Sequence, residues 1–129
     1  MRAALLIVLG LAIGIIGTVF VMNALEDRNP LPHAMMVTMS FHRHQLQQEI
    51  KAGHCDASAT VQQLQTMQML SKDIPSAFPG APQPFLDLAH QLYSAIETTA
   101  QAAPADCPAL AAALKPVDKV CGDCHHQYR

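Results

Sequence analysis

Two cysteines and a histidine lie close together near the C-terminus, in the run Cys121-Gly122-Asp123-Cys124-His125. The C-x-x-C-H spacing is the attachment signature of c-type haem, because two thiols can add across the vinyl groups of the porphyrin while the adjacent imidazole turns to the iron. We therefore expect one covalent haem c per chain, bound through Cys121 and Cys124, with His125 as the proximal ligand of the iron.

Two other kinds of site also use a C-x-x-C pair. A redox dithiol normally stands at the start of a helix that follows a strand, where the helix N-terminus lowers the thiol pKa, whereas this pair falls near the end of the last predicted helix. A zinc site of four cysteines would also need Cys55 and Cys107. The fourteen residues from Cys107 to Cys121 correspond to about 21 Å of helix, which is too long for one zinc ion. Both alternatives are therefore disfavoured.

The N-terminus is a long apolar segment. Between Arg2 and Glu26 there are 23 residues without a charged side chain, enough for a helix to cross a hydrocarbon core of about 30 Å. A cleaved signal peptide is the alternative, but its apolar core is usually shorter and ends at small residues, unlike Met22-Asn23-Ala24. We expect residues 1–25 to form an uncleaved anchor and residues 26–32 a linker to a domain at 33–129.

Charges around this segment predict its orientation. Arg2 and the terminal amine precede the span and Glu26 and Asp27 follow it, so the positive-inside rule leaves the short N-terminus in the cytoplasm. The protein is then a single-pass inner-membrane protein with its domain on the periplasmic side. Gly10 and Gly14 form a G-x-x-x-G pattern that is compatible with pairing of two anchors, which leaves a homodimer open.

The rest of the chain predicts an all-α fold, because apolar residues recur at helical spacing in four segments bounded by Gly and Pro. The segments run from Met35 to Ile50, Val61 to Leu70, Phe85 to Thr99 and Leu110 to Tyr128. Asp56 is the expected N-cap of the second segment, and the Pro-rich stretch 77–84 is expected to be a loop. Short connections between the first and second helices, and between the third and fourth, favour an antiparallel up-down-up-down four-helix bundle.

Composition excludes one class of partner. The net charge is −2, and the 8 lysines and arginines are scattered, so the chain has no basic patch for phosphates and we expect no nucleic acid partner.

The C-terminal run resembles a known family. C-x-x-C-H-x-x-Tyr-Arg on the fourth helix of an antiparallel bundle is similar to the cytochrome c′ family and its low-spin, methionine-ligated relatives, and Cys121, Cys124, His125, Tyr128 and Arg129 match that motif. The likeness spans roughly residues 31–129 through the helix order and the I-K-A-G end of the first helix. It implies that Arg129 lies near the haem on its proximal side. The anchor and a shortened loop between the second and third helices depart from most members, which are soluble and periplasmic.

Members of the family differ in what lies over the other face of the iron. High-spin members have an apolar residue there and an open sixth site, whereas low-spin members have a methionine ligand. The predicted helices one and four both have an end at the same pole of the bundle, so distances along them from that pole can be compared. At the helical rise per residue, Met36 and Met39 lie as far from the pole as the C-x-x-C-H motif and are level with the haem, and Met35 lies one residue outside. The family's Lys-Gly pattern at the end of helix one favours Met36 as distal ligand, and a one-residue shift in how I-K-A-G is aligned would give Val37 instead. Met35 or Met39, His33 or His42, and an open site remain alternatives, and all three methionines could simply be core.

Cys55 and Cys107 form a second pair. They fall in two predicted loops at the same pole of the bundle, so in an oxidising compartment they can form a disulfide that closes a loop of about fifty residues. Two unpaired thiols are the alternative, because sequence does not give the Cα separation that a disulfide needs.

These features together predict a membrane-anchored electron carrier. His–Met ligation keeps the iron six-coordinate and suits one-electron transfer to or from membrane-bound donors and acceptors, so we expect no enzymatic activity. One alternative is a five-coordinate cytochrome c′ that binds nitric oxide or carbon monoxide for scavenging or sensing. Another is a haem subunit of a respiratory complex.

Overall fold

The computed structural model describes residues 2–26 and 30–128. The all-α prediction is confirmed: the described part contains six helices and no strand. Residues 1–31 and residues 32–129 form two separate compact units.

The first unit is helix α1, Arg2–Glu26. Its segment Ile7–Ala24 has a mean hydropathy of 2.3 and is exposed throughout. By length and composition α1 can span a membrane, and a signal sequence would meet the same two criteria.

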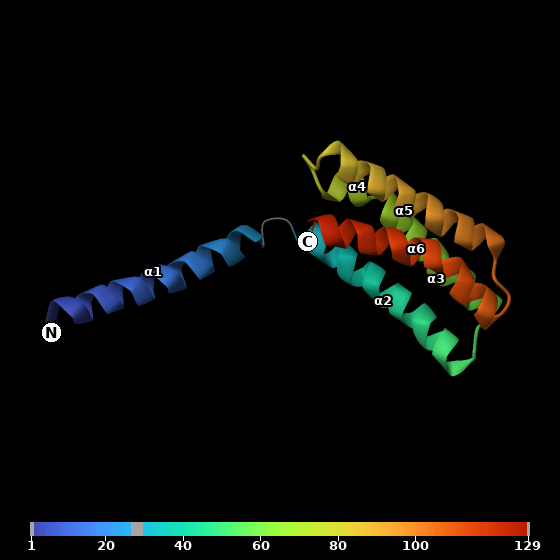
Figure 1. The fold of residues 1–129 in the computed structure, drawn as a ribbon, viewed down its shortest axis with the longest axis horizontal. Coiled ribbons are helices and arrows are strands. Elements are labelled where there is room, and N and C mark those ends of the chain that lie inside the picture. Colours follow the sequence, from blue (N-terminus) through green and yellow to red (C-terminus); the bar gives the residue numbers. More distant parts are fainter. Residues whose placement is uncertain (1, 27–29, 129) are drawn as a thin grey trace. The chain divides into compact units, whose positions relative to one another are not determined.

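The second unit contains four long helices and one short one. The long helices are α2 (Leu31–Ala52), α3 (Ala57–Lys72), α5 (Gln83–Ala102) and α6 (Cys107–Tyr128), and α4 (Ile74–Ala77) is a single turn. The four long helices contain the four segments predicted from apolar spacing. Figure 1 shows that the chain reverses direction between each long helix and the next.

The boundaries differ from the sequence prediction in two places. The linker is shorter than the predicted 26–32, because α1 extends through Glu26 and α2 begins at Leu31. Pro32 is therefore in the first turn of α2, where its missing N–H costs nothing. The turn α4 was also not predicted: Pro75 starts a new helical turn after Asp73 instead of only ending α3.

Local sequence explains the connection between α2 and α3. Gly53 has φ of +70°, a conformation that glycine adopts without steric cost, and it ends α2. The Asp56 carboxylate accepts a hydrogen bond from Ala59 N at 2.8 Å, so Asp56 is the N-cap of α3, as predicted. Bonds from Ser58 and from Ala59 lower the pKa of this carboxyl.

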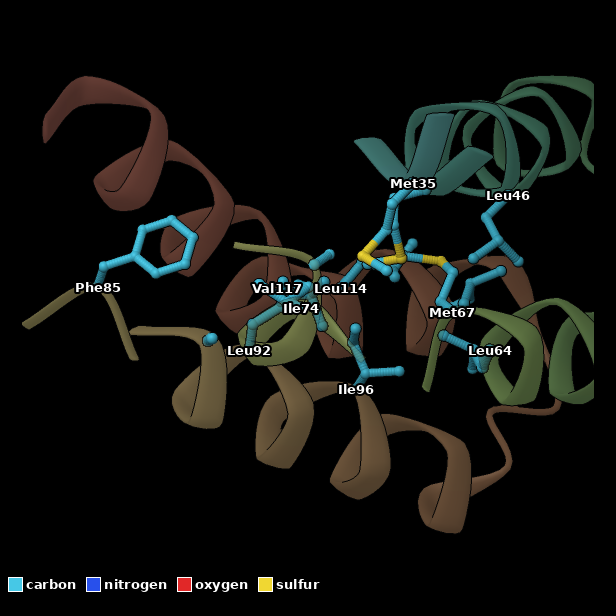
Figure 2. Packing of buried hydrophobic residues seen from close by; sticks show 14 residues of the cluster. Met35, Leu46, Leu64, Met67, Ile74, Phe85, Leu92, Ile96, Leu114 and Val117 are labelled. Carbon is cyan, nitrogen blue, oxygen red and sulfur yellow. The ribbon is translucent and has the colours of Figure 1, made fainter. Parts of the chain in front are cut away.

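One hydrophobic core joins α2, α3, α5 and α6 (Figure 2). Its fully enclosed side chains come from each of the four helices: Leu46, Leu64, Met67, Ile96, Leu110 and Val117. Helices α3 and α5, and α5 and α6, pack closely, whereas within the described residues no Cα of α2 lies within 8 Å of a Cα of another helix. Long side chains such as Met35, Met39 and Leu46 bridge this wider gap.

Helix α2 is held to the rest of the unit by two further links. A disulfide joins Cys55, just after α2, to Cys107 at the start of α6, with an S–S distance of 2.07 Å and a Cα separation of 5.3 Å. Farther along the two helices, the Arg43 guanidinium donates two hydrogen bonds of 2.7 Å to the Asp118 carboxylate. The disulfide and this ion pair fix α2 beside α6 although their backbones stay apart.

Candidate functional site

The last turns of α6 present the two free thiols and the imidazole along one side. Residues three and four apart on a helix share a face, and Cys121, Cys124 and His125 have this spacing. Both thiols are half-buried and His125 is exposed. All three residues line one cavity of about 400 Å³.

Helix α2 supplies the facing wall of this cavity. Met36, Met39, Ser40 and Arg43 line it, and they fall within two turns of the helix. Met35 lies outside the lining and is buried in the core. The structure therefore brings Met36 and Met39, the two methionines predicted to be level with the attachment motif, to the same cavity as that motif.

The remaining walls are apolar. They come from α3, α4 and α5, with Met67, Ile74, Phe85, Leu88, Ala89 and Leu92 in the lining. The unpredicted turn α4 contributes Ile74, which is buried. A largely apolar cavity with a few polar groups at its edge is the usual form of a cofactor site.

The polar edge is the ion pair between Arg43 and Asp118, which sequence reasoning missed. Both side chains line the cavity, and each is about one-third exposed, at 32% and 37%. A signal for them does exist in the sequence: Arg43 follows Met36 by seven residues and Asp118 precedes Cys121 by three, so each shares a helix face with a predicted site residue.

The environment keeps the two thiols protonated. Burial, with a contribution from the Asp118 charge, raises the pKa of Cys121 to about 11, and burial also raises the pKa of Cys124. A catalytic redox dithiol needs the opposite shift, because the thiolate is the reactive form. The site therefore lacks the electrostatic feature of a thiol oxidoreductase.

Other predicted residues lie elsewhere. His33 is exposed, and His42 Nδ1 lies 2.5 Å from Gln63 Oε1; neither histidine is in the cavity lining. Arg129 lies outside the described residues. Tyr128 packs edge-on against Phe85, with 5.3 Å between ring centres, and so joins the end of α6 to the start of α5.

A four-cysteine zinc site is incompatible with the structure. Cys55 and Cys107 are bonded to each other and are not free to bind a metal. Among residues 2–26 and 30–128, no three His, Cys, Asp or Glu side chains gather in a way that could hold a metal ion.

Comparison of the chain with protein-family models, with curated proteins and with solved structures found no match. The resemblance to cytochrome c′ therefore rests on the residues of the C-terminal motif and on the order of the helices.

Proposed function

We propose that this chain is a membrane-anchored c-type cytochrome that carries single electrons. The observation that supports it best is the shared cavity: both cysteines and the histidine of the C-x-x-C-H motif line one wall, and two methionines of α2 line another. A thioether facing an imidazole across a pocket is the donor pair of a six-coordinate electron-transfer haem.

The residues present fit a covalent haem. The cavity volume of about 400 Å³ is within the range of about 300–1,000 Å³ that is usual for cofactor sites. The Cys121 and Cys124 thiols are the attachment points, and His125 beside them is the proximal ligand. When bound, the haem supplies the one-electron chemistry, and the apolar side chains from α3, α4 and α5 exclude water from it.

We assign the distal position to Met36. Met36 is half-buried whereas Met39 is only 7% exposed and belongs to the packed core, so Met36 can reposition its thioether with less disruption of the packing. A bound thioether closes the sixth site, which favours electron transfer over binding of nitric oxide or carbon monoxide. Electron transfer needs no general acid, base or nucleophile, and we propose no enzymatic activity.

The proposed architecture is a four-helix bundle of α2, α3, α5 and α6 in up-down-up-down order. The common core and the alternating chain direction (Figure 1) support it. The proposed location is the periplasmic side of the inner membrane, with α1 as anchor. The Cys55–Cys107 disulfide supports this side of the membrane, because disulfides persist in oxidising compartments. Tethering there would concentrate the protein near membrane-bound donors and acceptors.

The test is the visible spectrum of the full-length protein, produced with a cytochrome c maturation system and purified in mild detergent. The expected result is a low-spin c-type spectrum whose reduced form does not change on addition of carbon monoxide. A large Soret shift with carbon monoxide would instead indicate the open site of a gas-binding cytochrome c′. A colourless protein would refute the proposal, and copurification with a larger assembly would indicate a respiratory-complex subunit.

A further inference from the structure

The cavity is unusually rich in sulfur. Its lining includes three thioethers, two thiols and one imidazole, from Met36, Met39, Met67, Cys121, Cys124 and His125. The chain has 7 methionines and 4 cysteines. Every cysteine outside the disulfide and three of the seven methionines therefore lie around this one space.

These donors come from three helices and face a shared interior. Met67 on α3 is 1% exposed, and Met36 and Met39 lie three residues apart on α2 and so share a face. Met35, which is 5% exposed, belongs to the same buried core as Met39 and Met67 (Figure 2), so a further thioether lies in that core. The thiols of α6 approach the same space from the end of the chain.

Ligand softness distinguishes the metals that such a site can select. Thiolates and thioethers favour Cu(I), whereas zinc is usually held by Cys, His and carboxylate sets. Within the described residues no cluster of three Cys, His, Asp or Glu is present, so a site in this cavity has to recruit methionine.

We propose that the haem-free protein binds one Cu(I) ion in this cavity, between the Cys121 and Cys124 sulfurs and the thioethers of Met36, Met39 and Met67. Each thiol that ligates the ion gives up its proton to solvent, and the copper is not oxidised or reduced. The proposal concerns the protein before haem attachment, so it does not depend on the proposed electron-transfer function. It does imply that Cu(I) and haem compete for the same two cysteines.

Methionine also fills gaps in apolar cores, and substitution by leucine separates packing from ligation. Leucine and methionine are similar in volume and exchange at low cost in stability. Replacing Met36, Met39 and Met67 together by leucine removes three thioethers while retaining an apolar wall. Met69→Leu is the matched control, because Met69 lies on α3 with a 64% exposed side chain outside the cavity.

The experiment uses the full-length chain in detergent, produced without the maturation system and with its disulfide intact. The protein is titrated anaerobically with Cu(I) in competition with bicinchoninate, after circular dichroism has shown that each variant is folded. We expect one Cu(I) per chain for the wild type and for Met69→Leu. For the triple leucine variant we expect an affinity lower by at least about tenfold, the loss typical even of residues that only support a metal ligand.

Two results would overturn the proposal. One is the absence of Cu(I) binding by the wild type. The other is a folded triple leucine variant that binds Cu(I) as tightly as the wild type, which would restrict the ion to the C-x-x-C-H segment. Neither result bears on whether the matured protein carries haem, because that is read from its colour. The failure of one proposal is therefore distinguishable from the failure of the other.

Discussion

The disulfide between Cys55 and Cys107 provides the prediction with the best-defined magnitude. The two cysteines are 52 residues apart in sequence. In the chain-entropy model, closing a loop of this size removes about 14 cal/mol/K from the unfolded state, or about 4 kcal/mol at 25 °C. We therefore expect Cys55→Ala/Cys107→Ala to lower the free energy of unfolding of the second unit by about 2–4 kcal/mol, where the lower value allows for residual structure in the unfolded chain.

The composition of the chain supplies a selective probe for this measurement. The chain has no tryptophan and 2 tyrosines, Tyr93 and Tyr128. Both lie in the second unit: Tyr93 accepts a hydrogen bond from Gln68 and Tyr128 packs on Phe85. Tyrosine fluorescence of the haem-free, full-length chain in urea therefore follows the second unit alone, without a signal from α1.

A reductant provides the matched control. A phosphine that reduces disulfides should destabilise the wild type by the same amount as the double substitution and should leave the Cys55→Ala/Cys107→Ala variant unchanged. The reasoning would be refuted if the variant unfolded at the same urea concentration as the oxidised wild type. It would also be refuted if the reductant destabilised both proteins equally.

Three further predictions concern the cavity. In the haem-loaded protein, Met36→Ala should open the sixth site, so the reduced protein should gain a large Soret shift with carbon monoxide; the Met69→Leu control should show none. Arg43→Gln should lower the reduction potential of the iron and Asp118→Asn should raise it, because a nearby positive charge disfavours the ferric state. Potentiometric shifts of the same sign for both variants would contradict this electrostatic reasoning. In the haem-free protein, alkylation of Cys121 should accelerate as pH rises through about 11, because the thiolate is the reactive form and burial raises the pKa of this thiol. Mass spectrometry that shows half-maximal reactivity of Cys121 near pH 9 would contradict this prediction.

The helices and the residues level with the motif could be predicted from sequence because both depend on local periodicity. The spacing of apolar residues located the four long helices of the second unit, and the helical rise per residue placed Met36 and Met39 opposite the cysteines. That Cys55 can pair with Cys107 also followed from sequence, because both fall in loops at one pole of the bundle, although two unpaired thiols stayed open as the alternative. These features need only the order and length of the helices.

The ion pair and the turn α4 could not be predicted in the same way. Whether Arg43 meets Asp118 depends on the rotation of α2 and α6 about their axes and on the wide gap between them, which helical spacing does not determine. The turn α4 is only four residues long, too short to show periodicity. The choice between Met36 and Met39 also depends on tertiary packing, because both residues share one face of α2.

The central claim is that Cys121 and Cys124 hold a porphyrin through covalent bonds, and extraction with acidified acetone tests it most directly. The full-length matured chain should keep its colour in the precipitated polypeptide, and Cys121→Ala/Cys124→Ala should keep none. A porphyrin that passes entirely into the acetone from the wild type, or a matured wild type without colour, would contradict the claim.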